Sequence, residues 1–409
     1  APSRPAKILR PSMTQAEIIT PRNEDEVMSI IDWALTEDKK LSIQGNNSKS
    51  WLGFPERATP NRIMQLDQVE GVVAYEPEEL FVAVRPGTPL RLVQHLLRQQ
   101  GQMLAFDPLD VGFFHHADAA GGTIGGMVAS GLSGSRRLKA GSVRDHLLGF
   151  RAVSGRGELF KSGGRVVKNV TGYDLSKLMT GSFGCLAAMT EVVLKTLPRP
   201  HDEATLFFGL ADVHAASSLA RKAWRSPLDA SCFGFFPAEL GLAPNISSGW
   251  VVAVRMDGAE NALEARTKRM MEYLGLDPHQ QMNASQSELF WQDYGHGRGF
   301  KDQQTVLRLT LKPTDAATLQ DQLPPQLHAT YDWAGGLAYV AGSLDVTGAE
   351  HLNNILQGLG INHLTIKAPG EVKQLLDWRN HPDEAVMKLE ARIRDAFDPK
   401  NVFCSERYF

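Results

Sequence analysis

Two glycine-dense segments are the part of this chain best suited to holding a ligand. The first spans residues 121–141 and includes the run Gly-Gly-Thr-Ile-Gly-Gly, and the second, residues 181–184, opens an apolar strand-like stretch. Glycine has no Cβ, so backbone N–H groups at glycine-rich turns approach a ligand closely. The two segments predict a large phosphate-bearing cofactor held mainly by main chain. We therefore expect the chemistry to come from that cofactor and not from a side-chain nucleophile.

A third segment, the loop of residues 45–50, directly follows the strand-like residues 41–43. Its glycine and asparagines tolerate left-handed backbone angles, which a backbone nest for a pyrophosphate requires, although an ordinary strand-to-helix turn explains the loop equally well. Residues 121–126 match neither the G-x-G-x-x-G dinucleotide motif nor the ATP P-loop. Residues 123–129 suit a helix whose first amides face an anion, but tight helix–strand packing also selects glycine.

Histidines near these segments do not suggest a metal site. His296 lies within Tyr-Gly-His-Gly-Arg-Gly-Phe, which we interpret as a flexible surface loop. His115 and His116 precede the first glycine segment, and Asp118 is the only further ligand close to them. We predict no metal site, and the catalytic residues stay unassigned.

Arginines flank the first glycine segment at positions 136, 137 and 144. Their guanidinium groups suit a carboxylate or a phosphate, but salt bridging at a domain surface or contact with a partner explains them equally well. Tyr173 is placed to donate to a cofactor, yet packing with its hydroxyl hydrogen-bonded is the interpretation we prefer.

Composition indicates an ordinary globular protein of two or three domains, with 409 residues, 43% hydrophobic and 22% charged. A net charge of −3 gives no case for nucleic-acid binding. The cysteines at positions 185, 232 and 404 form no CxxC pair, so we expect neither a zinc site nor an iron–sulfur cluster in this chain. Without a signal-like segment or an apolar run of membrane-span length, we expect a cytoplasmic protein with no direct membrane span.

Periodicity divides the chain after the proline pair at residues 198–200. Before it we expect a helix over 23–35, a strand over 80–85, a helix after Pro89, a hairpin over 147–160 and a strand over 190–197. After it, residues 205–274 and 306–366 resemble two β-α-β-β-α-β units separated by an irregular stretch, the first unit incomplete at its end. This pattern predicts an antiparallel sheet with helices on one face. A last helix over 382–396 leads to a tail.

The motifs together resemble the FAD-binding domain of the vanillyl-alcohol oxidase superfamily, also called PCMH-type. The resemblance rests on QGNNSKSWLG (44–53), RPGTPL (85–90), GTIGGMVASGLSG (122–134), GSVRDHLLG (141–149) and VKNVTGYDLSKLMTGSFG (167–184). Within this superfamily the chain is similar to the FAD-binding E subunits of bacterial glycolate oxidases, with which it shares GQML (101–104), SGSRR (133–137) and DWAGGL (332–337). The resemblance is strong over residues 21–200 and loose beyond them.

The resemblance implies an α+β fold in three parts. A PCMH-type FAD-binding domain covers residues 1–200 with an N-terminal arm over 1–20, an antiparallel-sheet cap domain with helices on one face covers 201–380, and a C-terminal helix and tail over 381–409 return to the FAD domain. The implied cofactor-binding residues are Gly45, Asn46, Asn47, Ser48, Lys49, Ser50, Pro108, Gly122, Thr123, Gly125, Gly126, Ala129, Ser130, Gly131, Gly184 and Val192. The first loop would wrap the pyrophosphate, and Gly184 and Val192 would lie near the adenine. Because that loop holds no His or Cys, the implied attachment is non-covalent.

As to function, the resemblance implies the FAD-binding subunit of a glycolate oxidase-type complex. Such a complex oxidises glycolate, a small 2-hydroxy acid, to glyoxylate; its partners would be a second flavin subunit and an iron–sulfur subunit that takes the electrons, peripheral to the inner membrane. Relatives that oxidise 2-hydroxy acids directly often carry a histidine cluster resembling H-x-G-x-G-x-x-H, which this sequence lacks. Two alternatives therefore stay open: a non-catalytic flavin-holding subunit for assembly or electron transfer, and a stand-alone FAD-dependent 2-hydroxy acid dehydrogenase.

The chain ends differently from these relatives. They tend to close on an Asn-Pro-Gly motif near the cofactor, where this sequence has Cys404-Ser405-Glu406. We therefore expect the tail to pack on the FAD domain without a role at the flavin.

Overall fold

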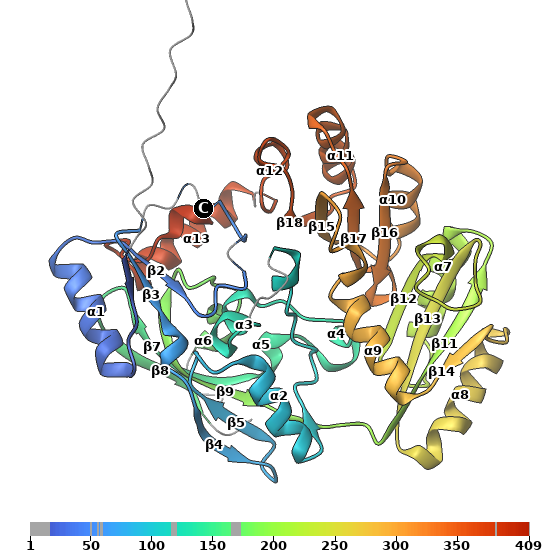
Figure 1. The fold of residues 1–409 in the computed structure, drawn as a ribbon, viewed down its shortest axis with the longest axis horizontal. Helices are drawn as coiled ribbons and strands as arrows, with labels where there is room; N and C mark the ends of the chain where they lie inside the picture. The colour runs from blue at the N-terminus through green and yellow to red at the C-terminus, as the bar shows by residue number, and fades with distance from the viewer. Residues whose placement is uncertain are drawn as a thin grey trace, which may run out of the picture.

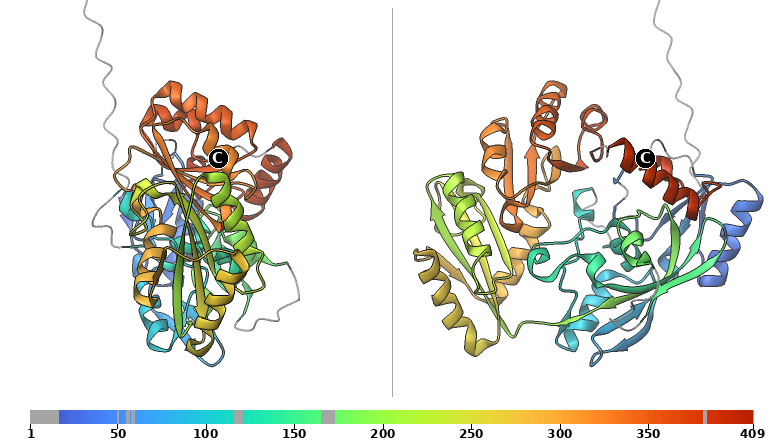
Figure 2. Two further views of the ribbon diagram at one scale, coloured as in Figure 1. Left: turned by 90° about the vertical axis from the view of Figure 1, so that its right-hand side faces the viewer. Right: turned by 180° about the vertical axis from the view of Figure 1, so that it is seen from behind.

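The structure is a computed structural model that describes residues 17–49, 51–54, 57, 60–115, 121–164, 173–380 and 383–408. Figure 1 shows two lobes, each built around its own sheets. We call residues 17–200 the N-terminal lobe and residues 202–380 the C-terminal lobe. The final helix and tail run back along the N-terminal lobe, as the view from behind in Figure 2 shows.

A parallel three-stranded sheet and one helix open the N-terminal lobe. The strand order is β1 (Glu17–Ile19), β3 (Arg62–Gln65) and β2 (Leu41–Gln44). Helix α1 (Glu24–Thr36) begins after Asn23, whose side-chain oxygen accepts a hydrogen bond from the Glu26 amide at 2.9 Å, as an N-cap residue does. The buried side chains of α1 belong to the same apolar cluster as Leu41 and Met64 of the sheet. The helix and strand predicted here are confirmed.

A five-stranded antiparallel sheet forms the rest of the lobe. Its order is β4 (Val72–Glu76), β5 (Phe81–Val84), β9 (Ala187–Lys195), β7 (Leu147–Ser154) and β8 (Leu159–Gly163). The helices of this lobe are α2 (Leu90–Gln99), α3 (Ile124–Ser130), α4 (Arg137–Ala140), α5 (Val143–His146) and α6 (Leu175–Met179). Two short strands, β6 (Gln102–Met103) and β10 (Leu197–Pro198), pair with each other. The predicted hairpin is the β7–β8 pair.

The C-terminal lobe is built on one antiparallel eight-stranded sheet with the order β14-β11-β13-β12-β16-β17-β15-β18. The strands are β11 (Asp202–Leu210), β12 (Cys232–Pro237), β13 (Trp250–Gly258), β14 (Gln280–Met282), β15 (Thr305–Thr310), β16 (Leu327–Asp332), β17 (Leu337–Gly342) and β18 (Asn362–Lys367). Two β-α-β-β-α-β units make up the sheet and join where Phe235 pairs with Tyr331. The first unit, predicted to be incomplete, is completed by β14, a three-residue strand too short to show a period in sequence.

Helices α7 (Val213–Trp224), α8 (Glu260–Leu274), α10 (Ala316–Gln322) and α11 (Val346–Gly358) supply the apolar cluster on one face of this sheet. Helix α9 (Ala284–Gly295) packs on the opposite face, where Trp291 and Tyr294 contact Phe207 and Phe236. The prediction of helices on one face therefore holds for these helices but not for α9. The stretch expected to be irregular contains this helix.

The end of the chain rejoins the N-terminal lobe. Helix α12 (Gly370–Leu376) follows β18, and helix α13 (Glu384–Phe397) packs Ile393 and Phe397 against the core of the five-stranded sheet. In the tail, the Leu41 amide donates to the Val402 carbonyl at 2.7 Å, and the Cys404 amide donates to the Leu41 carbonyl at 2.9 Å. The tail thus adds to the edge of the parallel sheet, as the packing prediction requires.

An aromatic cluster joins the two lobes. Trp51, Phe54 and Phe114 of the N-terminal lobe belong to one buried apolar cluster with Trp333 and Tyr339 of the C-terminal lobe. Burial of such large side chains on both partners favours a fixed arrangement of the lobes. Separately, none of the helices in the described ranges combines the length and apolar character needed to cross a bilayer.

Candidate functional site

The first loop and the first glycine segment lie in contact. A Cβ at Gly45 would come within 2.3 Å of Thr123 Oγ1, and Asn46 Nδ2 donates to the Gly121 carbonyl at 3.2 Å. Gly45 follows β2, and Thr123 is the N-cap of α3, where its Oγ1 accepts from the amide of residue 126. The close approach explains why position 45 holds a residue without a side chain.

A second contact joins the same two segments. A Cβ at Gly122 would lie 3.4 Å from Ser48 Oγ and 3.5 Å from Lys49 Nζ. Burial lowers the pKa of the Lys49 ammonium, and the nearby Asp110 carboxylate partly opposes that effect. A hydroxyl and an amine therefore face the backbone of the first glycine segment.

The second glycine segment meets the opposite end of α3. Gly131 ends this helix in the left-handed conformation, and a Cβ there would lie 3.2 Å from the Gly181 backbone. The Phe183 amide donates to the Ala129 carbonyl at 2.9 Å, and a Cβ at Gly184 would lie 3.6 Å from Ile43 of β2. All three segments singled out in the sequence thus surround one short helix.

This arrangement offers hydrogen-bond donors for a bound dinucleotide. Among the described residues, no backbone amide of Asn46, Asn47 or Ser48 donates a hydrogen bond, and Asn47 has a positive φ of 55°. Consecutive unpaired amides in a loop of this kind form an anion-binding nest. Trp51 Nε1, just after the loop, is buried without a hydrogen-bond partner. Since a buried unpaired donor is costly, this indole suits a ligand acceptor, and the residues present fit a diphosphate-linked cofactor.

The first backbone amides of α3, unlike those of the first loop, already donate hydrogen bonds within the protein. The amides of Ile124, Gly125 and residue 126 donate to the Thr88 carbonyl, the Pro86 carbonyl and Thr123 Oγ1. A Cβ at Gly125 would lie 2.7 Å from the Pro86 side chain. Of the two interpretations that the sequence left open for this helix, the structure supports tight packing over amides that face an anion.

The remaining predicted cofactor residues are spread around the same helix. Pro108 pairs with Ser133 in an isolated bridge, and Ser130 Oγ donates to the Met127 carbonyl at 3.1 Å. Val192 lies in the middle of β9 with no exposed surface, inside the core of the five-stranded sheet. Its predicted place near the adenine stays a prediction. Ser50 lies outside the described residues.

A buried ion cluster holds the lobes together beside this site. Arg136 pairs with Asp107 of its own lobe at 3.6 Å, and with Glu203 at 3.3 Å and Asp257 in the C-terminal lobe. Arg255 also pairs with Glu203, at 2.5 Å. Burial alone would lower the pKa of Arg136, but the surrounding carboxylates raise it above its ordinary value. For Arg136, salt bridging is the correct interpretation; Arg137 and Arg144 are exposed and join no ion pair within the described residues.

A turn of the C-terminal lobe with strained backbone angles contacts the first glycine segment. Trp333 and Ala334 have positive φ values of 52° and 55°, which residues with a Cβ rarely adopt. Trp333 Nε1 donates to the Gly134 carbonyl at 2.9 Å, and Asp332 accepts from Ser135 Oγ at 2.5 Å. Burial raises the pKa of Asp332 to about 7. Backbone strain of this kind persists only where surrounding contacts enforce it, and it is often found at functional sites.

His296 belongs to this junction and not to a flexible surface loop, so that prediction is wrong. It is half-buried at the C-terminal end of α9, and burial lowers its pKa while the Asp110 and Asp107 carboxylates oppose the shift. The flanking glycines serve close packing, because a Cβ at Gly295 would lie 2.6 Å from Ser135 Oγ and one at Gly297 would lie 2.8 Å from the Tyr339 ring. No sequence signal showed these contacts, which join residues far apart in the chain.

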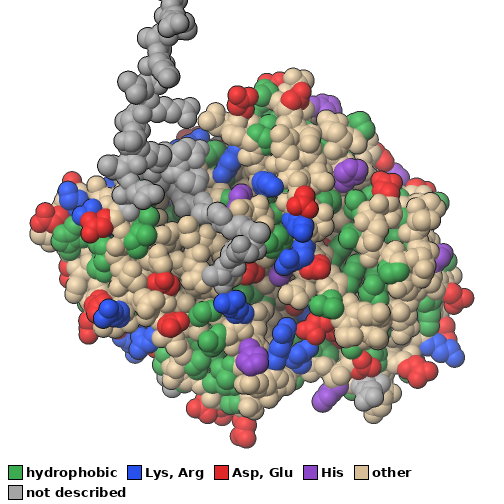
Figure 3. Space-filling model, viewed as in Figure 1, with side chains coloured by type: hydrophobic (Ala, Val, Ile, Leu, Met, Phe, Trp, Pro, Cys, Tyr) green, Lys and Arg blue, Asp and Glu red, His purple; other side chains and the backbone are tan. Residues whose placement is uncertain are grey.

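A pocket of about 550 Å³ opens beside His296 where the lobes meet. Pro108 and Ser135 line it together with Arg91, Arg98 and Arg199. Arg98 and Arg199 both pair with Glu288 of α9, at 3.2 and 3.1 Å. In the space-filling view, Lys and Arg side chains gather along the line where the two lobes meet (Figure 3).

Other candidates from the sequence have different surroundings. His115 stacks on Trp51 with ring centroids 5.6 Å apart, and its Nε2 lies 2.9 Å from the Ile366 carbonyl across the junction. Tyr173 is 93% exposed, so the prediction that it packs is wrong. His116 and Asp118 lie outside the described residues. No group of three or more metal-binding side chains occurs in the part of the chain that the structure describes.

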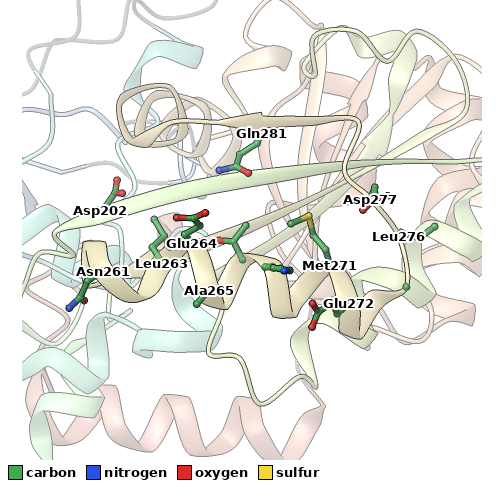
Figure 4. Close-up of a pocket in the computed structure, with 13 residues that line it drawn as sticks. Asp202, Asn261, Leu263, Glu264, Ala265, Met271, Glu272, Leu276, Asp277 and Gln281 are labelled. Carbon is green, nitrogen blue, oxygen red and sulfur yellow. The ribbon is translucent and has the colours of Figure 1, made fainter.

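A second pocket is lined by no residue of the glycine segments. It has a volume of about 1130 Å³ and runs along α8 between Asp202 and Gln281 (Figure 4). Its carboxylates include Glu264, Glu272 and Asp277, whereas Lys268 is its one cationic side chain. The groove offers no arrangement suited to a flavin nucleotide.

The first loop and the first glycine segment lie in a part of the chain that matches a known family. Residues 16–163 match the family model described as FAD binding domain. The chain is a FAD-dependent oxidoreductase, in agreement with relatives that act on hydroxy acids. The predicted cofactor, FAD, is confirmed.

The chain belongs to the family of glycolate oxidase subunit GlcE. It is 35% identical to that subunit from Escherichia coli (strain K12) over 383 residues, which are 93% of this chain and 95% of the relative. It is 26% identical to glycolate oxidase subunit GlcD from Bacillus subtilis (strain 168), over 49% of this chain and 41% of the relative. It is also 26% identical to the mitochondrial D-lactate dehydrogenase (cytochrome) of Arabidopsis thaliana, over 64% of this chain and 42% of the relative.

Solved structures show the same fold. Alkyldihydroxyacetonephosphate synthase superposes with a TM-score of 0.69, covering 94% of this chain and 76% of that chain, at 14% sequence identity. At this identity the likeness shows the fold alone. The predicted family resemblance and the α+β fold class are confirmed.

Proposed function

We propose that this chain is the FAD-binding subunit of a glycolate oxidase-type complex that oxidises glycolate to glyoxylate. Its partners in the proposal are a second flavin subunit and an iron–sulfur subunit that receives the electrons, and any membrane association is peripheral and through these partners. The observation that carries the proposal is the similarity to GlcE over nearly the full length of both chains. Similarity to D-lactate and D-2-hydroxyglutarate dehydrogenases supports a 2-hydroxy acid as substrate.

In this proposal the first loop holds the cofactor pyrophosphate without a covalent bond. The unpaired amides of Asn46, Asn47 and Ser48, with the Lys49 ammonium beside them, supply donors and positive charge. The loop has no His or Cys side chain for attachment to a flavin. Residues 1–200 are then the FAD domain, residues 201–380 the cap, and residues 381–409 a helix and tail that return to the FAD domain.

Oxidation of a 2-hydroxy acid needs an acceptor for the hydride, a base for the hydroxyl proton and a cation for the carboxylate. Bound FAD supplies the hydride acceptor. The chain's own residues orient the lobes. Arg136 forms ion pairs from the FAD domain to Asp257 and Glu203 of the cap. Trp333 Nε1 donates a hydrogen bond to the Gly134 carbonyl. These contacts are buried, and a charge interaction is stronger where solvent is remote.

Anaerobic addition of glycolate tests the proposal. We expect the visible absorption of the flavin to bleach when glycolate is added to the FAD-loaded full-length chain, and the released electrons to reduce the iron–sulfur subunit in the assembled complex. Flavin that stays oxidised in the chain alone but is reduced in the complex would make this chain a flavin-holding subunit, the main alternative. Reduction at the same rate with and without partners would instead indicate a stand-alone dehydrogenase.

Acid precipitation of the purified chain tests the mode of attachment. We expect the yellow colour to leave with the supernatant, because the first loop offers no nucleophile. Colour that stays with the pellet would contradict non-covalent binding.

A further inference from the structure

Arg308 of β15 carries a buried positive charge that no carboxylate pairs with. The residue is 7% exposed, and its Nη2 donates to the Ser133 carbonyl at 3.1 Å. Its Nε is buried and has no hydrogen-bond partner. Within the described residues Arg308 forms no ion pair. An isolated charge in such surroundings is strongly unfavourable unless an anion meets it.

The buried carboxylate of Asp332, on which the charge of Arg308 acts, forms no ion pair with it. Both carboxylate oxygens of Asp332 accept hydrogen bonds from other groups. Oδ2 accepts from Ser135 Oγ at 2.5 Å, and Oδ1 accepts from the Trp333 amide at 2.7 Å. Burial raises the pKa of Asp332, while the charge of Arg308 acts to lower it. The two groups therefore interact through space, but Arg308 has no directly bonded carboxylate within the described residues.

A second arginine shares the same aromatic ring. The guanidinium carbons of Arg137 and Arg308 lie 4.7 and 5.1 Å from the centroid of the Trp333 ring. Burial and the charge of Arg308 both lower the pKa of Arg137, as expected when two cations lie close together. Arg137 is exposed, so the pair has one enclosed member and one that solvent reaches. The Asp145 carboxylate partly opposes the lowering of the pKa of Arg137. Neither arginine forms an ion pair within the described residues, so two neighbouring cations are available to one anion.

Both lobes build this group next to the proposed cofactor segment. Ser133 and Gly134, which bond Arg308 and Trp333, come directly after the helix and cap formed by residues 124–131. The strained turn at Trp333 fixes the indole against this backbone. A planar guanidinium with a free Nε matches a carboxylate, which it binds through two parallel hydrogen bonds.

We propose that Arg308 and Arg137, on either side of the lobe junction and sharing the Trp333 ring, form the carboxylate-binding site for a small 2-hydroxy monocarboxylate. The choice of this ligand class rests on the proposed function. Arg308 supplies the buried donors, Arg137 attracts the anion from solvent, and the indole gives the site an apolar wall. This assigns a substrate-specificity role to Arg308, which the sequence analysis did not single out.

Calorimetric titration of the FAD-loaded full-length chain with oxalate tests the site, with glycolamide as the uncharged comparison. We expect oxalate to bind and glycolamide to bind much more weakly. Arg308→Met should weaken oxalate binding about 10- to 100-fold, the effect of losing hydrogen bonds to a charged group. Arg137→Met, an exposed change that does not depend on core packing, should weaken it by a smaller factor. Arg144→Met, the matched exposed arginine of the same region, should leave it unchanged.

Three outcomes would overturn the proposal. One is oxalate affinity unchanged in both Arg308→Met and Arg137→Met, and another is glycolamide binding as tightly as oxalate. The third is a shifted flavin reduction potential in Arg308→Met with unchanged oxalate affinity, which would make the flavin the anion that Arg308 serves. Oxalate binding is measured without turnover, so a failure of glycolate to reduce the flavin would remove the proposed function while leaving this site intact.

Discussion

Ser135 Oγ donates a 2.5 Å hydrogen bond to Asp332 Oδ2 across the junction between the lobes. The two residues are 197 positions apart in sequence, and both are buried. Asp332 also accepts from the amide of Trp333, so it fixes the start of the turn that meets the first glycine segment. One carboxyl group therefore couples the position of the C-terminal lobe to the backbone next to the proposed cofactor site.

The raised pKa of Asp332 makes stability depend on pH. Burial keeps the proton on the folded protein up to about pH 7, whereas the unfolded chain loses it near the ordinary value of 3.8. The unfolded state binds fewer protons between these values, so the free energy of unfolding falls as pH rises through this window. The loss amounts to at most about 4 kcal/mol, since each pKa unit is worth about 1.4 kcal/mol.

Asp332→Asn should remove this slope, because its amide keeps a donor and an acceptor but does not titrate. We expect the variant to gain stability relative to the parent between about pH 5 and about pH 8, as measured by urea unfolding. Asp321→Asn, a change at an exposed surface carboxylate, serves as control. A parent and an Asp332→Asn variant with parallel pH profiles would show that this carboxyl is already ionised in the folded protein.

Arg136 should be among the most sensitive positions at the junction. Arg136→Met leaves Asp257 buried without its ion-pair partner and leaves Glu203 with Arg255 alone. Breaking a buried pair from one side typically destabilises by about 3–5 kcal/mol. Denaturant unfolding of the variant measures the loss. The exposed Arg144→Met should change stability by less than about 0.5 kcal/mol. A loss as small for Arg136 as for Arg144 would mean that the cluster does not hold the lobes.

Much of the fold follows from patterns within short stretches of sequence. The α1 helix is marked by Asn23 before an acidic first turn, and the β7–β8 hairpin by strands around a glycine turn. Helix α9 was missed because it has little apolar periodicity. Its start nevertheless carries a capping box, in which Asn283 and Gln286 bond each other's backbone amides. That local signal would have predicted the helix.

The junction residues could not be found in the same way. The glycines around His296 are selected by the approach of Ser135 and Tyr339, which come from distant parts of the chain. Nothing in the identity of Trp333 or Ala334 indicates a left-handed backbone, and Arg308 becomes unusual only because folding buries it without a carboxylate. Sequence patterns indicate which segments are turns, whereas the charge balance of a buried site emerges only from tertiary packing.

Asn47 should be replaceable by glycine but not by a β-branched residue. Its φ of 55° is left-handed, which costs an ordinary side chain about 1–2 kcal/mol. Because Asn47 is exposed, Asn47→Val loses no packing and acts through the loop conformation. We expect Asn47→Val to weaken FAD binding about tenfold, because a free-energy cost of about 1.4 kcal/mol corresponds to a factor of ten in affinity. Flavin fluorescence titration measures this affinity. Asn47→Gly should bind as the parent does, and equal affinity for all three proteins would contradict a nest in this loop.

Gly45 tests whether the first loop and α3 must touch for the cofactor to bind. The Cβ of Gly45→Ala would lie 2.3 Å from Thr123 Oγ1, so either the loop or the helix start must shift. Overpacking of this kind destabilises by about 1–3 kcal/mol. We therefore expect a lower unfolding midpoint and a lower FAD content in the purified protein, measured from its absorption spectrum.

Gly358→Ala, at the end of α11 with no atom within 4 Å of the new Cβ, is the matched control. It should retain full FAD content and keep or slightly raise the midpoint, since alanine favours helix by up to about 1 kcal/mol. Normal FAD content in Gly45→Ala would mean that the cofactor does not depend on contact between the loop and Thr123.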